Sequence, residues 1–165
     1  MIKWIWLAVI VIILDQLTKY VASTSLILYQ PHAVMPMFNW TLMHNTGAAF
    51  SFLHDAGGWQ RWFFAAIAVV VSTVILLWLK RLQKHETWQA IALAMIMGGA
   101  IGNVIDRIWL GYVVDFIDVY YQQWHWPAFN LADSAITVGV AIIIIDALCE
   151  ARKKSKSNQT KEQDE

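Results

Sequence analysis

The chain has 165 residues, of which 58% are hydrophobic and only 15% are charged. This composition lies outside the range of soluble domains and indicates one α-helical, membrane-embedded domain. Twelve basic residues balance twelve acidic ones, so the excess of positive charge expected of a nucleic-acid-binding protein is absent. The single cysteine excludes an intrachain disulfide bond.

The first predicted transmembrane helix covers about residues 2–22, whose apolar run is long enough to cross a bilayer. Asp15 and Lys19 interrupt this run four residues apart, which argues against a cleaved signal peptide and places both side chains on one helix face. Two interpretations of this pair stay open. It is either an interfacial pair whose lysine extends toward water, or a buried strut beneath a functional site.

The next segment, about residues 23–61, is too polar and too interrupted to span a membrane. Apolar residues alternate with others at residues 38–42 and again at residues 50–52, on either side of a turn-forming sequence at residues 44–47. This pattern predicts a β-hairpin with one aromatic face. We expect a small sheet here, either as a surface loop stabilised by aromatic contacts or as an apolar platform at the membrane surface.

Three more apolar segments are each expected to span the bilayer, at about residues 62–79, 88–105 and 131–149. The third of the four predicted helices carries Gly98, Gly99 and Gly102 on a face of small residues. Close packing between helices is the more frequent role of such a face. The alternative hypothesis is that these glycines form a groove for the helical end of a peptide substrate.

The lysines and arginines predict the orientation of the chain. Lys3, the connection at residues 80–84 and the cluster at residues 152–156 all fall on one side of the four-helix arrangement. Because basic connections mark the cytoplasm, both termini are expected inside, with the small sheet and a loop at residues 109–129 outside. The tail, residues 151–165, is basic and then polar without apolar content, and we expect it to be disordered.

Polar residues concentrate between the last two predicted helices. The stretch contains Asn103, Asp106, Arg107, Asp115, Asp118, Asn130 and Asp133. Ionisable groups beside apolar helices are costly, so this concentration indicates a functional site. Two neighbouring carboxylates share one proton at neutral pH, which suits acid-base hydrolysis of a peptide bond. The alternative is that the acids only pair with Arg107 or face water.

Other chemistries have weaker support. Ser134 lacks the turn of a nucleophilic serine, and no HExxH or cysteine-histidine spacing indicates a metal site. A divalent ion would still have candidate ligands in Asp115, Asp118, His125 and Asp133. His125 is more simply explained as an interfacial side chain between two tryptophans. A metal-dependent lipid phosphatase with Arg107 on the phosphate and a proton-coupled carrier using Asp115 and Asp133 stay open as alternatives.

Four blocks of the sequence resemble the bacterial lipoprotein signal peptidase family, also called signal peptidase II. They are LDQLTK at residues 14–19, NTGAAFS at residues 45–51, GNVIDRIWLGYVVDF at residues 102–116 and FNLADS at residues 129–134. Their order and spacing are far more specific than any single block. Together they extend from the first predicted helix to the fourth.

The resemblance implies an intramembrane aspartic endopeptidase that removes the signal peptide from prolipoproteins by cutting before a diacylglyceryl-modified cysteine. By the family's motifs, Asp115 and Asp133 are expected to be the catalytic pair, and Asp118 a bystander. Roles in orienting the substrate and the pair are expected for Asn45, Gly47, Asn103, Arg107 and Asn130. Asp15 and Lys19 match a structural supporting pair.

The resemblance also implies a single protease domain at residues 1–150, whose external sheet forms a cradle for the lipidated segment. We expect a monomer among membrane lipids in the bacterial cytoplasmic membrane, with its active site at the external face and with neither a metal nor another cofactor. A non-enzymatic helper that presents lipoproteins is a further alternative. Because Asp133 lies in the first turn of a predicted helix, whose dipole favours a carboxylate, we expect Asp115 to hold the shared proton more often.

Overall fold

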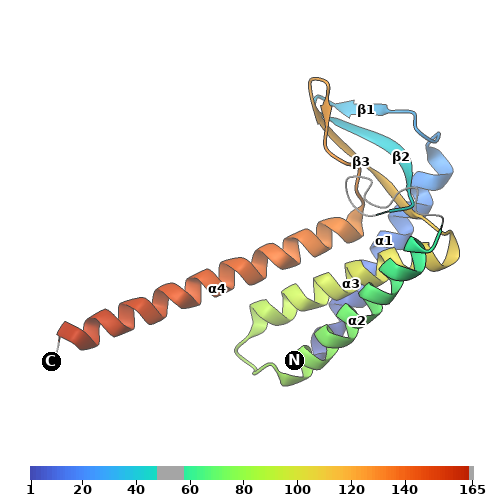
Figure 1. The fold of residues 1–165 in the computed structure, drawn as a ribbon. Coiled ribbons are helices and arrows are strands. Elements are labelled where there is room, and N and C mark those ends of the chain that lie inside the picture. The colour runs from blue at the N-terminus through green and yellow to red at the C-terminus, as the bar shows by residue number, and fades with distance from the viewer. Residues whose placement is uncertain (48–57, 164–165) are drawn as a thin grey trace.

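The structure is a computed structural model that describes residues 1–47 and 58–163. Within these residues, four helices are long and apolar enough to cross a membrane, and a small antiparallel sheet accompanies them, which confirms the predicted fold class. The helices are α1 (Ile5–Ser25, preceded by the 3-10 turn Ile2–Trp4), α2 (Gln60–Arg81), α3 (Thr87–Trp109) and α4 (Leu131–Gln163). The sheet lies at one end of the helices, and the N-terminus and the α2–α3 connection lie at the other (Figure 1).

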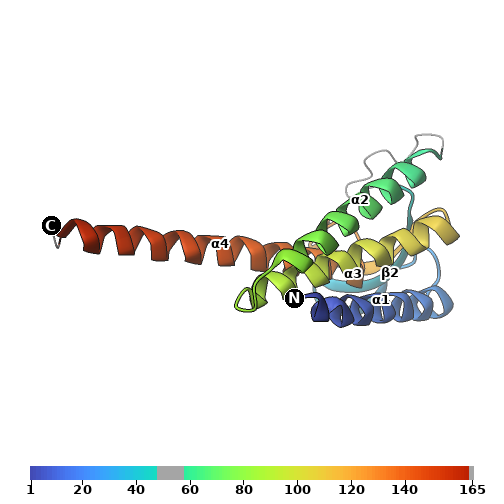
Figure 2. The same cartoon turned by 90° about the horizontal axis from the view of Figure 1, so that it is seen from below.

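Helix α3 is the central helix and packs against α1, α2 and α4; Figure 2 shows α1 and α2 on either side of it. Its glycines permit this close approach. A Cβ atom at Gly98 would lie 2.8 Å from the Ala8 carbonyl oxygen of α1, and one at Gly99 would overlap the Ala132 carbonyl oxygen of α4. The neighbouring helices therefore fill the small-residue face. The packing interpretation is confirmed and the hypothesis of a peptide groove is wrong.

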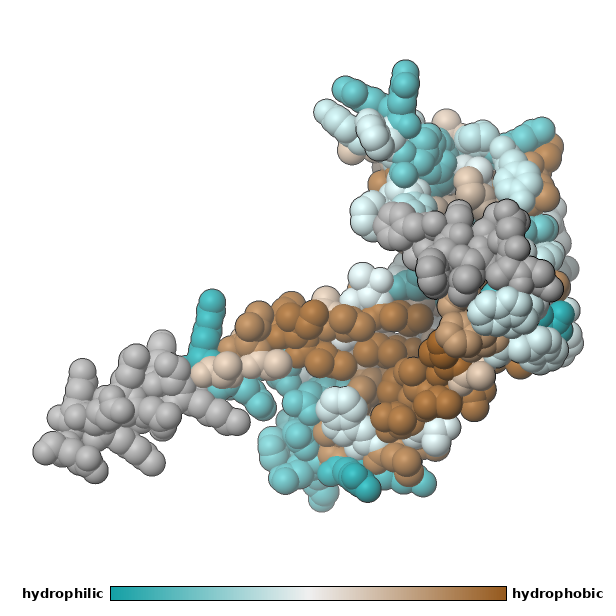
Figure 3. Space-filling model, in the orientation of Figure 1, coloured by the Kyte–Doolittle hydropathy of each residue, from teal (hydrophilic) through white to brown (hydrophobic). Residues whose placement is uncertain are grey.

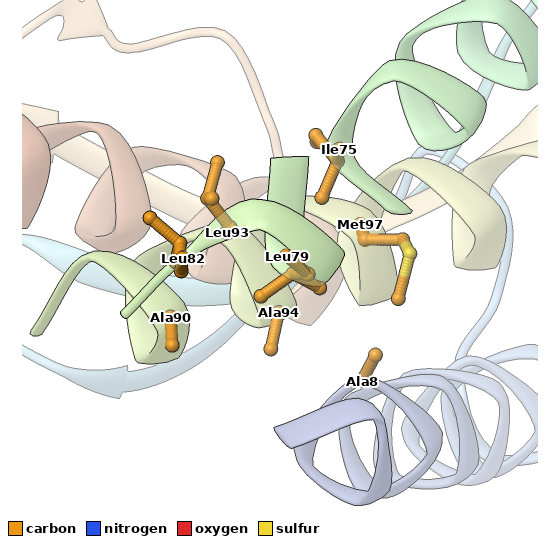
Figure 4. Close-up of a cluster of buried hydrophobic side chains, with 8 residues drawn as sticks. All are labelled: Ala8, Ile75, Leu79, Leu82, Ala90, Leu93, Ala94 and Met97. Carbon is orange, nitrogen blue, oxygen red and sulfur yellow. The ribbon is translucent and has the colours of Figure 1, made fainter. Parts of the chain in front are cut away.

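A cluster of buried apolar side chains fastens α2 to α3 near their short connection (Figure 4). Leu79 of α2 and Ala90 and Ala94 of α3 are fully buried in this cluster, and Ala8 of α1 joins it. Most of the remaining surface of α2 consists of exposed apolar side chains. The space-filling view shows a similar apolar surface along α4 (Figure 3). Exposed apolar surface on helices of this length is the surface that lipid covers.

The described strands form one antiparallel sheet in the order β1-β2-β3-β4. They are β1 (His32–Met35), β2 (Phe38–Asn45), β3 (Val113–Tyr121) and β4 (Trp124–His125). The predicted hairpin is therefore only partly correct, because β2 pairs with β1 and β3. The segment at residues 50–52, predicted as its partner, lies outside the described residues.

The loop predicted at residues 109–129 is instead largely strand β3 and the short strand β4. The β-branched and aromatic residues of β3 favour a strand. Its two acids, Asp115 and Asp118, are buried and hydrogen-bonded to side chains from distant parts of the chain. Strand β2 has one extra residue between the pairs Trp40–Ile117 and Met43–Asp115, a bulge directly beside Asp115.

The tail also differs from its prediction. Helix α4 continues through Gln163, where a disordered segment was expected beyond residue 150. The sequence after Gly139 contains neither glycine nor proline, and it is rich in lysine, arginine, glutamine and glutamate. These residues favour a helix, so the backbone has no local reason to end α4 where the apolar run ends.

Candidate active site

Asp115 lies on β3 opposite Met43 of β2, and only 2% of its surface is exposed. Asn45, at the end of β2, donates from Nδ2 to Asp115 Oδ2 at 3.0 Å. Asn130, just before α4, donates from Nδ2 to Asp115 Oδ1 at 2.7 Å. Each carboxylate oxygen of Asp115 therefore has an amide donor, and the two donors come from different elements.

Asp133 is the third residue of α4, where it completes the helix N-terminus. Its backbone N–H donates to Asn130 Oδ1 at 3.0 Å, and its Oδ2 accepts from the Asn130 backbone N–H at 3.3 Å. This reciprocal pair has the arrangement of a capping box. Asp133 Oδ1 accepts from Asn103 Nδ2 of α3 at 2.8 Å. The Asp133 carboxylate is therefore held both by the backbone at the N-terminus of α4 and by Asn103 of α3.

Asn130 connects the two aspartates directly. Its side-chain amide nitrogen bonds to Asp115 while its side-chain oxygen bonds to the backbone of Asp133. The same amide nitrogen also donates to Asn103 Oδ1 at 3.2 Å. Asn130 is fully buried, so these bonds have no competition from water. The structure therefore brings Asp115, Asp133, Asn103 and Asn130 into one hydrogen-bonded cluster.

Burial raises the pKa of Asp115 to about 7, and the negative charge of Asp133 acts in the same direction. The amide bonds from Asn45 and Asn130 oppose this shift because they stabilise the ionised carboxylate. Near neutral pH, Asp115 therefore retains a proton that an ordinary aspartate has lost. This direction agrees with the expectation that Asp115 holds the shared proton.

Arg107 of α3 is half-buried beside this cluster. Its Nη2 donates to the Gly47 carbonyl at 3.1 Å, and its guanidinium lies over the ring of Phe64, 5.3 Å from the ring centre. The Gly47 backbone N–H in turn donates to Asn45 Oδ1 at 3.0 Å. Arg107 thus holds the backbone that orients Asn45 toward Asp115.

Asp15 and Lys19 are both buried, which answers the question that the sequence left open. Lys19 Nζ lies 2.8 Å from Asp15 Oδ2 and donates to Asn103 Oδ1 at 2.9 Å. Asp15 Oδ1 accepts from the backbone N–H of Ala132, in the first turn of α4, at 2.9 Å. The pair is therefore a buried strut that joins α1 to the residues around Asp133.

Asp106 and Gln16 complete this network, and the sequence assigned neither of them a role. Asp106 Oδ2 lies 2.9 Å from Lys19 Nζ, and Asp106 Oδ1 accepts from Gln16 Nε2 at 2.9 Å. Asp106 belongs to the polar stretch between the last two predicted helices, so its residue type and position indicated that it lies near a functional site. Gln16 had no such indication beyond its position next to Asp15.

A cavity of about 580 Å³ opens at this cluster. Its polar lining includes Asn45, Asn103, Arg107 and Asp133, and residues 126–129 and 136–138 contribute most of the remainder. Figure 3 shows the surface hollowed where the sheet meets α4. The cavity is large enough for a segment of a ligand and brings that segment against Asp133.

Asp118 and His125 lie apart from the cluster and bond to each other, with His125 Nδ1 2.7 Å from Asp118 Oδ1. Asn39 Nδ2 and Thr41 Oγ1 of β2 also donate to Asp118, at 3.1 and 3.0 Å. Burial would raise the pKa of Asp118, but these hydrogen bonds hold it below its usual value. In residues 1–47 and 58–153, no group of three His, Cys, Asp or Glu side chains is arranged to hold a metal ion.

The family model and the sequence relatives agree on one family. The sequence model of the family described as signal peptidase (SPase) II matches residues 7–149. A lipoprotein signal peptidase of Pseudomonas aeruginosa is 58% identical over 147 residues, which cover 88% of this chain and 87% of the relative. One of Alteromonas mediterranea is 54% identical and covers 95% of this chain and 86% of the relative. A solved structure of a bacterial membrane enzyme superposes with a TM-score of 0.82 at 35% identity, and the match covers 92% of this chain and 91% of that one.

Proposed function

The chain belongs to the signal peptidase II family, and we propose that Asp115 and Asp133 are its catalytic pair. Its activity is that of an aspartic endopeptidase acting on prolipoproteins. The scissile bond is the one before a cysteine that carries a diacylglyceryl group. The pair and the substrate backbone are oriented by Asn45, Gly47, Asn103, Arg107 and Asn130. The buried pair Asp15 and Lys19 supports these residues from α1.

The single observation that carries the proposal is the shared contact through Asn130. One side chain bonds both to the carboxylate of Asp115 on β3 and to the backbone of Asp133 on α4. The two acids are 18 residues apart in the sequence and belong to different kinds of element. A purely structural role would not require one acid to line a cavity while a second, joined to it through Asn130, has a pKa raised to about 7.

The chemistry follows from one proton shared between two carboxylates. Asp133, as the carboxylate, takes a proton from water while the water oxygen attacks the carbonyl carbon, and Asp115 donates its proton to the carbonyl oxygen. The tetrahedral diol then collapses. Its hydroxyl returns a proton to Asp115, the C–N bond breaks, and Asp133 passes its proton to the departing amine. The pair ends with the one proton with which it began.

The distribution of basic residues supports an active site at the external face of the cytoplasmic membrane. The N-terminus, to which Lys3 is close in sequence, and the α2–α3 connection lie at the end of the helices away from the sheet, and α4 runs from the sheet toward its basic C-terminal segment (Figure 1). Basic connections mark the cytoplasmic side, so both termini are cytoplasmic. Diacylglyceryl chains would then lie in the outer leaflet beside Asp133. The chain is expected to act as a monomer, and the assigned groups need no residue from a second copy.

Family membership gives no support to the metal-dependent phosphatase or to the proton-coupled carrier. The four candidate metal ligands also divide into two groups. Asp118 and His125 bond to each other, whereas Asp115 and Asp133 are joined through Asn130. Arg107 bonds to the protein backbone at Gly47, which is a different role from that of a phosphate ligand.

The proposal is tested by cleavage of a synthetic prolipoprotein peptide by the purified protein in detergent. We expect hydrolysis before the diacylglyceryl-modified cysteine, at the same rate with and without a chelator. A matched peptide with an unmodified cysteine should be cut at least about tenfold more slowly, because it lacks the lipid that holds the bond at the interface. Loss of activity with chelator, or no cleavage of the modified peptide, would contradict the proposal.

The rate should also depend on pH in a defined direction. Because the pKa of Asp115 is about 7, kcat should fall about tenfold per pH unit above that value as Asp115 loses the proton that it donates. Asn45→Ala removes a bond that favours the ionised carboxylate, so its falling limb should move to higher pH. Rates measured between about pH 6 and about pH 9 check both expectations. A flat profile, or a limb that Asn45→Ala leaves in place, would disagree with the assigned role of Asp115.

A further inference from the structure

Asp106 is a buried carboxylate on α3 that has no part in the proposed chemistry, and only 3% of its surface is exposed. Its Oδ2 accepts a hydrogen bond from the backbone N–H of Val114 at 3.1 Å and lies 2.9 Å from Lys19 Nζ. Its Oδ1 accepts from Gln16 Nε2 at 2.9 Å. One carboxylate on α3 is therefore tied both to α1 and to the backbone of β3.

Val114 is the residue directly before Asp115, and both of its backbone polar groups bond to side chains. The N–H donates to Asp106 Oδ2, and the carbonyl accepts from Asn130 Nδ2 at 3.3 Å. The N–H and carbonyl of one strand residue point to the same edge of the sheet. At Val114, the Asp106 carboxylate and the Asn130 amide therefore bond to the edge of β3. They take the place that a neighbouring strand would have at this edge.

The Lys19 ammonium is the common partner of the elements that carry the two catalytic aspartates. It contacts Asp106, which holds β3, and Asn103, whose amide donates to Asp133. It also contacts Asp15, which caps α4 at the backbone N–H of Ala132. Helix α4 is thus linked to Lys19 by two routes, through Asp15 and Asn103. Strand β3 is linked to Lys19 by the Asp106 carboxylate, which contacts both the Lys19 ammonium and the backbone N–H of Val114.

We propose that Asp106 is a positioning residue for peptide hydrolysis, because it fixes the backbone of β3 at Val114 relative to Lys19 so that Asp115 meets Asp133. This inference rests on the proposed function. A displacement of about 1 Å in a catalytic group lowers a rate by about 10²-fold. Loss of the Asp106 contact should therefore lower kcat, while KM changes little because the cavity lining stays in place.

The test uses Asp106→Asn and Asp106→Glu in the full chain, with the diacylglyceryl-modified peptide as substrate. Asp106→Asn loses the charge that faces Lys19, and we expect kcat to fall by about 10- to 10²-fold with KM within about twofold of the native value. Asp106→Glu keeps the charge, so it protects folding, but its longer side chain displaces Val114 and should lower kcat as well. Rates are normalised to monodisperse protein with native helix content.

Asp146→Asn is the matched control. Asp146 is also an aspartate on a membrane-spanning helix, and it accepts a hydrogen bond from a glutamine, Gln89 Nε2, at 3.0 Å. It lies on α4 well beyond the residues that line the cavity. Asp146→Asn should therefore retain native kcat and KM.

The outcomes separate the two proposals. Folded Asp106→Asn or Asp106→Glu protein with native kcat would overturn the inference, since the carboxylate would then serve stability alone. A rise in KM at unchanged kcat would also overturn it. If Asp106→Asn does not fold, kcat of Asp106→Glu decides. If the native chain does not cut the peptide, the proposed function fails and the inference falls with it, whereas native activity with unaffected Asp106 variants removes the inference alone.

Discussion

Asp115→Asn and Asp133→Asn should each lower kcat for cleavage of the lipidated peptide by at least about 10²- to 10⁴-fold, the contribution of one general acid or base. Asparagine has nearly the shape of aspartate, yet it cannot take a proton from water or give one to the carbonyl oxygen. KM should change little, because the cavity keeps its shape. Initial rates over a range of peptide concentrations, measured on folded protein in detergent, give both constants.

Asp118→Asn is the control for this pair, because Asp118 is the second buried aspartate of the strand that carries Asp115. Its carboxylate bonds to Asn39, Thr41 and His125, so its replacement should loosen the sheet and leave kcat within a few-fold of the native value. Native activity in Asp115→Asn or Asp133→Asn would rule out the catalytic pair. Loss of activity in folded Asp118→Asn equal to that in Asp115→Asn would show that the assay reports damage to the sheet.

The membrane-spanning helices were predictable because lipid requires long apolar runs. Residues 62–79 and 88–105 are such runs, each with two polar residues. The strands were harder to predict. The aromatic alternation around Phe38 indicated β2, but its principal partner is β3, which lies about 70 residues later in the chain. Pairing over such a distance leaves no local signal in the turn chemistry.

The acids of β3 made this strand hard to recognise from the sequence. Buried charges are rare in strands, so Asp115 and Asp118 weigh against a strand as long as their partners are unknown. The partners are Asn45, Asn130 and His125, with Asn39 and Thr41, and all of them depend on the tertiary fold. Recognition of residues 113–121 as a strand would have separated the two acids, because side chains three residues apart on a strand point to opposite faces.

The candidate site was predictable from motifs to a greater extent than from chemistry. Chemistry alone left a shared-proton pair, a metal site and a proton relay open, and the resemblance of four sequence blocks selected Asp115 and Asp133. The structure adds what neither source contained. Asp106 accepts the backbone N–H of Val114, a contact to a main-chain group that carries no sequence signature of its own.

Lys19→Met should produce the largest loss of stability of any single change considered. Lys19 is 3% exposed and its ammonium makes three contacts, with Asp15, Asp106 and Asn103. Methionine fills much of the volume but leaves two buried carboxylates without their cation. Removal of one partner from a buried ion pair costs about 3–5 kcal/mol, so the free energy of unfolding should fall by about this amount. Thermal or denaturant unfolding in detergent measures it.

Two further variants show whether this loss arises from the buried charges. Lys84→Met removes an exposed lysine from the α2–α3 connection and should change the free energy of unfolding by less than about 0.5 kcal/mol. Adding Asp106→Asn to Lys19→Met removes one of the two uncompensated carboxylates, so the double variant should be more stable than Lys19→Met alone, a clear departure from additivity. If Lys19→Met is as stable as Lys84→Met, or if Asp106→Asn makes Lys19→Met less stable, the ammonium does not neutralise these carboxylates. The Asp15–Lys19 pair would then be held in place by packing alone.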